Sequence, residues 1–361
     1  MSPRTPGARR ARPGKVGTGS TGAPDRERLL VLSAALRDVP VAVVGDLVLD
    51  RYWFGRSSRI SREAPVLILD FEEERGVPGG AANAAMNARS LGGRPRIVGR
   101  VGRDEAGRDL ARALRAKGLD PRWLLKDGAG TIVKTRILAG SSHTSRQQIV
   151  RLDRGHGAVL PRSGERSLER ALERAVTGAR AALLSDYGYG VLAAPLRRAA
   201  IAVAKRAGVP VVVDSRYALR SYRGATLLTP NEHEIRDAFH LPSLDTGALR
   251  RAGEELRERT AARGVWITRG SDGMMLLERG RKALRIPIVG SSDVADVTGA
   301  GDAVSAAATL ALGAGATLLE AALLATYAAS VVVMKRGTAT VSRAELEQAI
   351  RAHPVPHPEP A

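Results

Sequence analysis

Residues 179–214 read ARAALLSDYGYGVLAAPLRRAAIAVAKRAGVPVVVD, and the pattern of this stretch decides the fold class. One apolar run, at 179–184, is followed by Ser185 and Asp186. An amphipathic stretch comes next over 193–207, and a second apolar run at 209–213 is followed by Asp214. Short apolar runs that alternate with amphipathic helical stretches are typical of βαβ units. We therefore expect an α/β fold with a largely parallel central sheet.

The same alternation extends outward in both directions, with further strands expected at 41–45, 225–228 and 265–268. A polar residue lies at or just after the end of each expected strand. Ligands of open α/β sheets bind outside the carboxyl ends of the strands, so these side chains predict one shared crevice. They are Asp46, Asp186, Asp214, Asn231 and Arg269.

Three segments do not fit this alternation of strands and helices. Residues 66–71, and the pair 131–138 with 147–153, have alternating or β-branched residues, which predicts antiparallel strands. We expect a small sheet beside the main one. Its exposed edges suit it to cover the crevice or to form a dimer contact.

The composition indicates a globular protein. With 361 residues, of which 44% are hydrophobic and 26% charged, the chain can bury one large core or two ordinary ones. The absence of cysteine excludes disulfides, thiolate metal sites and cysteine nucleophiles, and it permits a reducing compartment such as the cytoplasm. Residues 303–334 are nearly uncharged, but glycine at 313 and 315 and many alanines predict two core helices rather than a membrane span.

Part of the formal net charge of +19 is concentrated near the N-terminus, where seven basic residues fall within residues 1–28. We expect a disordered arm at 1–28, a folded domain at 29–352 and a frayed, proline-rich tail at 353–361. Elsewhere arginine is interleaved with alanine and glutamate, as on solvated helix faces. Aromatic residues make up only 3% of the chain, so nucleic-acid binding is not expected.

The segment DVTGAGD at 296–302 is the most informative for chemistry. Its glycines allow backbone N–H groups to converge at a helix N-terminus, which favours an anion such as a phosphate oxygen. Asp302, in the first turn, can accept a proton from a hydroxyl that attacks phosphorus. The alternative is an ordinary connecting turn in which Asp302 only complements the helix dipole.

The segment PGGAAN at 78–83 opens a second small-residue helix, which ends at Gly92-Gly93. Its paired glycines allow a ligand to lie against the backbone, and Asn83 offers both a donor and an acceptor to a polyol. Taken alone, the segment is better explained as an ordinary turn followed by a helix cap.

These two segments resemble the signature regions of the ribokinase-like (PfkB) sugar kinases, and the similarity runs from about residue 41 to about residue 350. It is closest to the branch that phosphorylates D-glycero-β-D-manno-heptose 7-phosphate at C1, on the route to ADP-heptose for lipopolysaccharide. The further segments that carry this resemblance are GDLVLDRYW at 45–53, SRIS at 58–61, EAPV at 63–66, RLD at 151–153, LSDY at 184–187, RGATLLTPN at 223–231 and GTATVS at 337–342.

The resemblance implies a three-layer αβα kinase domain at 29–352 with a β-sheet lid formed by strands near 50–75 and 131–153. It implies ATP and Mg²⁺ as cofactors, a sugar phosphate as substrate, and a cytoplasmic homodimer joined through the lid. Asp302 would be the general base, and Gly299, Ala300 and Gly301 would form the anion hole.

The resemblance also implies the binding residues. The sugar would contact Asp46, Gly79, Gly80, Asn83, Asp153 and Asp186, and its 7-phosphate would contact Arg151 and Arg216, unless these two arginines form surface ion pairs. The nucleotide side would comprise Asn231, Glu234, Thr268, Arg269, Gly270 and Gly273, with Glu234 holding Mg²⁺ through water.

The chain departs from the family pattern in three respects. Asp214-Ser215-Arg216 replaces the usual Asp-Pro-Lys, which puts substrate detail in doubt. Thr326 and Tyr327 stand where relatives usually have asparagine near the base pocket, so adenine preference is open. Many relatives also fuse a nucleotidyltransferase with a His-x-x-His motif, so here we expect a separate nucleotidyltransferase.

The alternative to a heptose-phosphate kinase is a PfkB-type kinase for another sugar, sugar phosphate or nucleoside. A non-enzymatic nucleic-acid binder is a more distant alternative.

Overall fold

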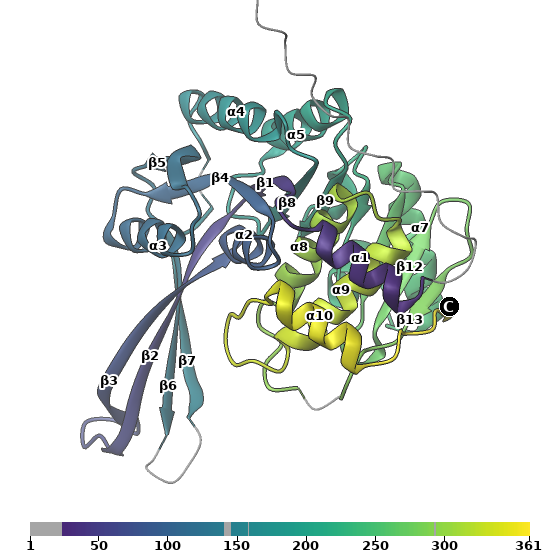
Figure 1. The fold of residues 1–361 in the computed structure, drawn as a ribbon. Coiled ribbons are helices and arrows are strands. Elements are labelled where there is room, and N and C mark those ends of the chain that lie inside the picture. The colour runs from purple at the N-terminus through teal and green to yellow at the C-terminus, as the bar shows by residue number, and fades with distance from the viewer. Residues whose placement is uncertain (1–23, 141–145, 158, 292–293) are drawn as a thin grey trace, which may run out of the picture.

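The computed structural model describes residues 24–140, 146–157, 159–291 and 294–361 (Figure 1). In these residues a ten-stranded sheet forms the centre of the molecule. The strands from β5 to β11 run parallel to their neighbours, and those from β11 to β14 run antiparallel, which confirms the predicted mainly parallel sheet. In spatial order they are β14 (Glu359–Pro360), β13 (Leu284–Ile286), β12 (Met274–Glu278), β11 (Gly264–Thr268), β10 (Leu227–Leu228), β9 (Val211–Ser215), β8 (Ala181–Asp186), β1 (Pro40–Gly45), β4 (Arg94–Gly102) and β5 (Leu124–Asp127).

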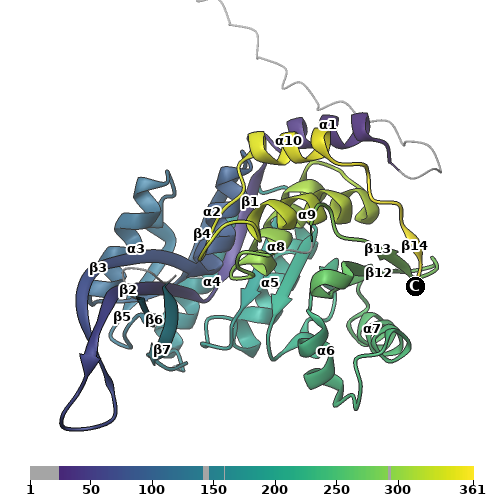
Figure 2. The same cartoon turned by 90° about the horizontal axis from the view of Figure 1, so that it is seen from below.

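Both faces of this sheet are buried, because successive strand residues point to opposite sides. On β1, Val41 and Val43 belong to one core cluster, while Ala42 and Val44 belong to the other. The first cluster lies under α1 (Arg26–Ala35), α2 (Ala81–Ser90), α3 (Glu105–Ala116), α8 (Ala300–Gly313), α9 (Leu318–Val332) and α10 (Arg343–Ala352). The second lies under α4 (Arg162–Val176), α5 (Ala194–Arg206), α6 (Glu232–Phe239) and α7 (Thr246–Thr260), so the fold has the predicted three layers (Figure 2).

The nearly uncharged stretch at 303–334 forms α8 and α9, as predicted. The two helices are buried along most of their length, and their many alanines allow them to pack closely against each other. In the part of the chain that the structure describes, no helix has both the length and the apolar character that crossing a bilayer requires.

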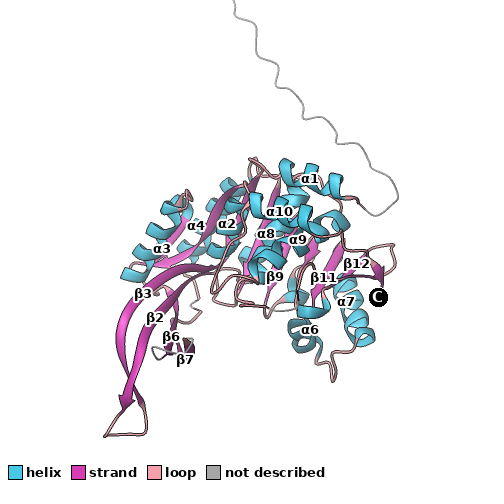
Figure 3. Cartoon of the chain, turned by 60° about the horizontal axis from the view of Figure 1, so that its bottom comes forward, coloured by secondary structure: helices cyan, strands magenta, loops and turns pink. Residues whose placement is uncertain are grey.

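A separate four-stranded sheet, the lid, projects from one end of the central sheet (Figures 1 and 3). Its spatial order is β3 (Leu67–Gly80), β2 (Leu47–Ile60), β6 (Ile132–Gly140) and β7 (Gln147–Arg154). The small sheet and the antiparallel pairing of β6 with β7 confirm the prediction. The parallel pairing of β2 with β6, and the fourteen-residue lengths of β2 and β3, were not predicted.

Both ends of the folded domain extend further than predicted. Helix α1 begins at Arg26, where the Asp25 carboxylate accepts a hydrogen bond from the Arg28 N–H at 2.8 Å, so residues 26–28 are helical rather than disordered. Residues 1–23 of the predicted arm lie outside the described residues. The tail at 353–361 is not frayed, because β14 pairs with β13 and the carbonyl of Pro354 accepts a hydrogen bond from the Tyr327 hydroxyl at 2.9 Å.

Candidate active site

A cavity of about 400 Å³ opens at the carboxyl ends of the parallel strands, the edge at which open α/β sheets bind ligands. Lid strands β2, β3 and β6 form one wall. The rest is lined by segments at the ends of β8, β9, β10 and β11, by the starts of α6 and α8, and by Thr338. The lining residues are Val48, Asp50, Gly80, Lys134, Arg136, Asp186, Tyr187, Asp214, Arg216, Thr229, Asn231, Glu234, Thr268, Val297, Thr298, Gly299, Gly301, Asp302 and Thr338.

The start of α8 points into this cavity. Gly299 precedes the helix with φ at 81°, a left-handed backbone conformation that favours glycine. A side chain there would also crowd Asn83, since a Cβ would lie 2.7 Å from the amide nitrogen Nδ2. The first N–H groups of a helix have no partner within the helix, so the start of α8 is suited to an anion. Gly299 and Gly301 line the cavity there, whereas the Ala300 N–H already donates to the Val297 carbonyl at 3.2 Å.

Asp302 lies in the first turn of α8, is 4% exposed, and has a donor on each carboxylate oxygen. Asn83 Nδ2 donates to Oδ2 at 2.8 Å, and the Tyr187 hydroxyl donates to Oδ1 at 2.9 Å. Burial, and then the negative charge of Asp214, raise the pKa of Asp302 to about 7, although the hydrogen bonds from Asn83 and Tyr187 act in the opposite direction. A carboxyl group with such a pKa can exchange a proton near neutral pH.

Asp46 does not lie on the cavity wall, although we predicted a contact with sugar hydroxyls. It is 1% exposed, and its carboxylate accepts three backbone hydrogen bonds at 2.9–3.0 Å, from the N–H groups of Tyr187, Tyr189 and Val191. The acceptor capacity of this carboxylate is therefore used to hold the loop that follows β8. The structure corrects the predicted role from sugar binding to support of that loop.

The predicted Gly79-Gly80 turn brings a lid carboxylate into the site. A Cβ at Gly79 would overlap Oδ2 of Asp50, so glycine allows Asp50 to approach the backbone. Gly80, with φ at 59°, lines the cavity immediately before α2. Asp50 pairs with Arg136 at 2.5 Å and accepts from the Thr338 hydroxyl at 3.3 Å. Sequence reasoning missed Asp50, although its place two residues after Val48 puts it on the same face of the strand.

Three cationic side chains line the cavity, namely Lys134, Arg136 and Arg216. Arg136 is ion-paired with Asp50, but Lys134 and Arg216 both lie over the ring of Tyr187. The Lys134 Nζ is 5.6 Å and the Arg216 Cζ is 5.2 Å from the ring centroid. Burial, and then the positive charge of Arg216, lower the pKa of Lys134. Lys134 was not predicted, because only the pairing of β2 with β6 brings it here.

Arg151 and Asp153, both predicted to bind substrate, lie on β7 outside the cavity lining. They form an ion pair with each other at 2.9 Å, and both side chains are at least two-fifths exposed. Arg151 therefore forms a surface ion pair, which was the stated alternative to phosphate binding for this residue. Of the predicted phosphate-binding arginines, only Arg216 reaches the cavity.

The nucleotide side is only partly assembled as predicted. Asn231, Glu234 and Thr268 line the cavity, and the first two close the start of α6, since each side chain accepts from the backbone N–H of the other at 2.9 Å. Arg269 does not line the cavity but pairs with Glu232 at 3.6 Å and Asp272 at 3.3 Å. The predicted Gly270 and Gly273 also lie outside the lining, in the turn between β11 and β12.

Two acidic side chains on this side of the cavity have raised pKa values. Burial, and then the charge of Glu234, raise the pKa of Asp214 to about 7, and burial raises the pKa of Glu234. A half-buried acid pair with amide and hydroxyl oxygens nearby fits a hard cation such as Mg²⁺. Within the described ranges no three acidic, histidine or cysteine side chains cluster as a self-sufficient metal site. The fit is therefore to an ion that also binds water and phosphate oxygens, as Mg²⁺ commonly does.

The other residues singled out from the sequence have structural partners. Asp186 reaches the cavity wall while it accepts from the Tyr222 hydroxyl at 2.7 Å and the Ser215 hydroxyl at 3.0 Å. On α9, the Thr326 hydroxyl donates to the Ala322 carbonyl, and the Tyr327 hydroxyl donates to that of Pro354. Neither α9 residue lines the cavity.

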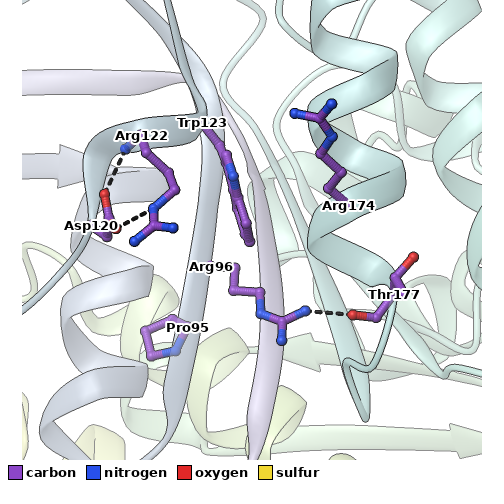
Figure 4. Close-up of a pocket in the computed structure, with 7 residues that line it drawn as sticks. All are labelled: Pro95, Arg96, Asp120, Arg122, Trp123, Arg174 and Thr177. Atoms are coloured by element: carbon purple, nitrogen blue, oxygen red, sulfur yellow. Dashed lines mark hydrogen bonds and ion pairs between the residues drawn. The ribbon is translucent and has the colours of Figure 1, made fainter.

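Another cavity, of about 500 Å³, lies near the start of β4 and is lined by Arg96, Arg122, Arg174 and Trp123, among others (Figure 4). Arg96 donates to the carbonyls of Ala175 and Thr177 at the end of α4, where a cation stabilises a helix C-terminus. Arg122 is paired with Asp120. Since two of the three arginines already have partners, we assign no site here.

The comparisons with known proteins agree with this geometry. The family model described as pfkB family carbohydrate kinase matches residues 40–345. The bifunctional protein HldE of Halorhodospira halophila is 45% identical over 323 residues, which are 89% of this chain and 65% of that protein. HldE of Nitrosococcus oceani is 41% identical over 315 residues, or 87% of this chain and 64% of that protein. The chain thus spans slightly less than two-thirds of the length of these relatives.

Solved structures show the same fold at lower identity. Arabidopsis thaliana ribokinase complexed with ribose and ATP has a TM-score of 0.68 at 21% identity, and the match covers 87% of this chain and 99% of that one. Phosphofructokinase-2 from Escherichia coli in complex with substrates and products has a TM-score of 0.70 at 19% identity, with the same coverage.

Proposed function

This chain belongs to the pfkB family of carbohydrate kinases, and we propose that it transfers a phosphoryl group from ATP to the C1 hydroxyl of D-glycero-β-D-manno-heptose 7-phosphate. As a family member it is a phosphotransferase that acts on a sugar hydroxyl. Two observations support the choice of sugar. The segments at 45–53, 184–187 and 223–231 resemble the heptose-phosphate branch, and the chain is 41–45% identical to relatives named HldE.

The observation that carries the proposal is the position of Asp302 beside the N-terminus of α8 at the cavity wall. Asp302 would accept the proton of the C1 hydroxyl as that oxygen forms its bond to the γ-phosphorus, and the bond from this phosphorus to the β,γ-bridging oxygen would break to release ADP. The backbone of Gly299 and Gly301, which line the cavity, would stabilise the negative charge on the transferred group.

Lys134 and Arg216 are suited to the phosphate that the substrate already carries. Both line the cavity, and neither takes part in the ion pairs found within the described residues. Their charges lie against aromatic faces, which hold cations in place without neutralising them. We therefore propose Lys134 and Arg216 in place of the predicted pair of Arg151 and Arg216.

We propose ATP as the phosphoryl donor, bound on the side of Asn231 and Thr268, because the structurally similar Arabidopsis ribokinase was solved with ribose and ATP. Asn231 and Glu234 would hold Mg²⁺ through water, with Asp214 adding negative charge beside it. When bound, the ion would neutralise charge on the nucleotide phosphates.

The test is a comparison of acceptors with one purified protein sample. Heptose 7-phosphate, the unphosphorylated heptose, fructose 6-phosphate, ribose and adenosine are each offered with ATP and Mg²⁺, and ³¹P NMR locates the new phosphate. We expect the highest kcat/KM for heptose 7-phosphate, with the new phosphate at C1. A higher kcat/KM for any of the other acceptors would overturn the proposal.

We also propose a homodimer joined through the lid. The lid exposes apolar side chains on both outer strands, among them Phe71 on β3, which is 65% exposed, and Leu152 on β7, which is 53% exposed. Exposed apolar side chains on unpaired strand edges favour association with a second copy. A cytoplasmic location and a separate nucleotidyltransferase that acts on the product are further proposals that follow from the family resemblance.

A further inference from the structure

Tyr187 lies between the two functional parts of the cavity. It is the first residue after β8, and its hydroxyl donates to Oδ1 of Asp302 at 2.9 Å. The ring of the same side chain lies 5.6 Å from the Lys134 Nζ and 5.2 Å from the Arg216 Cζ. One side chain therefore contacts both the carboxylate that would take the proton and the cations that would receive the substrate's phosphate.

The surroundings of Tyr187 restrict its movement. Its backbone N–H donates to Oδ2 of Asp46 at 2.9 Å, and the same oxygen accepts from the N–H of Tyr189. The ring packs against the start of α2, where a Cβ on Gly80 would lie 3.5 Å from its Cδ2. The α2 helix also carries Asn83, the other donor to Asp302. Because both partners of the carboxylate are fixed in this way, its orientation is set before a substrate binds.

We propose that Tyr187 is a positioning residue for phosphoryl transfer, whose hydroxyl orients the Asp302 carboxylate and whose ring seats Lys134 and Arg216 for an anionic sugar substrate. The ring part rests on the proposed function, because it requires a phosphate on the substrate. The hydroxyl part holds for any sugar that the enzyme phosphorylates, because it concerns only the base.

The two parts have separate physical consequences. A hydroxyl that donates to a carboxylate favours its ionised form, so loss of the Tyr187 hydroxyl favours the protonated base. The other groups that face Asp302 are the Asn83 amide and the carboxylates of Asp214 and Asp50, of which the two carboxylates also favour protonation. Loss of the ring instead leaves two long cationic side chains without a surface that keeps them over the cavity.

Two variants separate these consequences. Tyr187→Phe keeps the ring, and we expect kcat at pH 7 to fall roughly tenfold while KM for heptose 7-phosphate stays within about twofold. The acid limb of its pH profile should lie at higher pH than that of the wild type. Tyr187→Leu removes the ring as well, and KM for heptose 7-phosphate should also rise roughly tenfold while KM for ATP is unchanged.

Tyr327→Phe is the matched control, because it removes another phenol hydroxyl with a hydrogen-bond partner, on α9 and outside the cavity lining. Its kcat and its KM for heptose 7-phosphate should equal those of the wild type. If Tyr187→Leu loses its thermal unfolding transition, Tyr187→Met, which is closer in length, replaces it.

A Tyr187→Phe enzyme with wild-type kcat and an unmoved acid limb would overturn the hydroxyl part. Equal KM values for heptose 7-phosphate in the Phe and Leu variants would overturn the ring part. If the wild type phosphorylates only an unphosphorylated sugar, the proposed function fails, and the ring part fails with it. The hydroxyl part is then decided with that sugar by the same comparison of Tyr187→Phe with the wild type.

Discussion

The side-chain amide of Asn83 donates a hydrogen bond to Oδ2 of Asp302 at 2.8 Å, although 219 positions separate the two residues in the sequence. Asn83 lies in the first turn of α2 and Asp302 in the first turn of α8, so two helix N-termini converge at one carboxylate. The amide that we expected to bind a polyol therefore contacts the proposed general base.

Replacement of Asp302 by Asn should lower kcat by roughly 10²–10⁴-fold, because an amide cannot accept the proton of the attacking hydroxyl. The side chain keeps its size, so binding of ATP and of the sugar phosphate should persist, as measured by the shift that each causes in the thermal unfolding midpoint. A kcat within threefold of the wild type would exclude Asp302 as the base.

Activity should depend on pH through the same group. Because the pKa of Asp302 is raised to about 7, the carboxyl is increasingly protonated below that pH and can no longer accept a proton. We expect kcat/KM to rise with pH up to about 7 and to level off above it, as measured by initial rates from acidic to mildly alkaline buffers. A flat profile across pH 7 would contradict this assignment.

Replacement of Gly299 by Ala should damage both stability and catalysis. Its left-handed backbone, with φ at 81°, would cost about 1–2 kcal/mol with a Cβ, and that Cβ would also press on the buried Asn83 amide. We expect a loss of stability in urea unfolding together with a kcat reduced by roughly 10²-fold.

Gly178→Ala is the matched control for Gly299→Ala. Gly178 has a similar φ of 74°, but an added Cβ would meet no atom within 4 Å. The control should show the stability loss and keep wild-type kcat. Equal kcat values in the two variants would mean that the contact of Gly299 with Asn83 has no role in catalysis.

The cations of the cavity can be distinguished by their effect on sugar binding. Loss of a hydrogen bond to a charged group weakens binding by about 1.5–3 kcal/mol, so Lys134→Ala should raise KM for heptose 7-phosphate by roughly 10–100-fold. Arg151→Ala should change it by less than about threefold, because Arg151 pairs with Asp153 outside the cavity lining. If steady-state kinetics show a larger rise in KM for Arg151→Ala than for Lys134→Ala, the phosphate contact of Arg151 predicted from the sequence is restored.

Association through the lid should depend on its apolar face. Phe71→Asp puts a charge on the exposed part of β3, and we expect light scattering to report 38.2 kDa for this variant and twice that mass for the wild type. Val31→Asp, on an exposed part of α1 outside the lid, should remain dimeric. A wild-type mass of 38.2 kDa at micromolar concentration would contradict the dimer.

The central sheet was predictable because its strands are buried on both faces and so read as continuous apolar runs. The predicted boundaries failed where polar residues are buried within a strand, as at Ser185 and Asp186, both of which belong to β8. The outer half of β2 has no continuous apolar run that would predict a strand. Its residues toward Ile60 are mostly exposed, and they are held by backbone pairing with β3.

The glycine segments led to Asp302 and to the start of α8, because a helix that opens with glycine beside a carboxylate is visible in the sequence alone. Three cavity residues, Lys134, Asp50 and Tyr187, were not predicted. The positions of Lys134 and Asp50 depend on the pairing of the lid strands, and that of Tyr187 depends on a loop held by the distant Asp46 carboxylate. Asp46 was misassigned for a related reason, since the sequence does not show that three backbone N–H groups reach its side chain.

A single residue, Asp46, separates the last residue of β1 from the first of β2, and no residue separates the end of β3 from the start of α2. The inner ends of these two lid strands are thus joined directly to the central sheet and to α2. Without a linker at this point, the half of the ribbon that carries Asp50 has no hinge where it leaves the core, and Asp50 keeps its place next to α2.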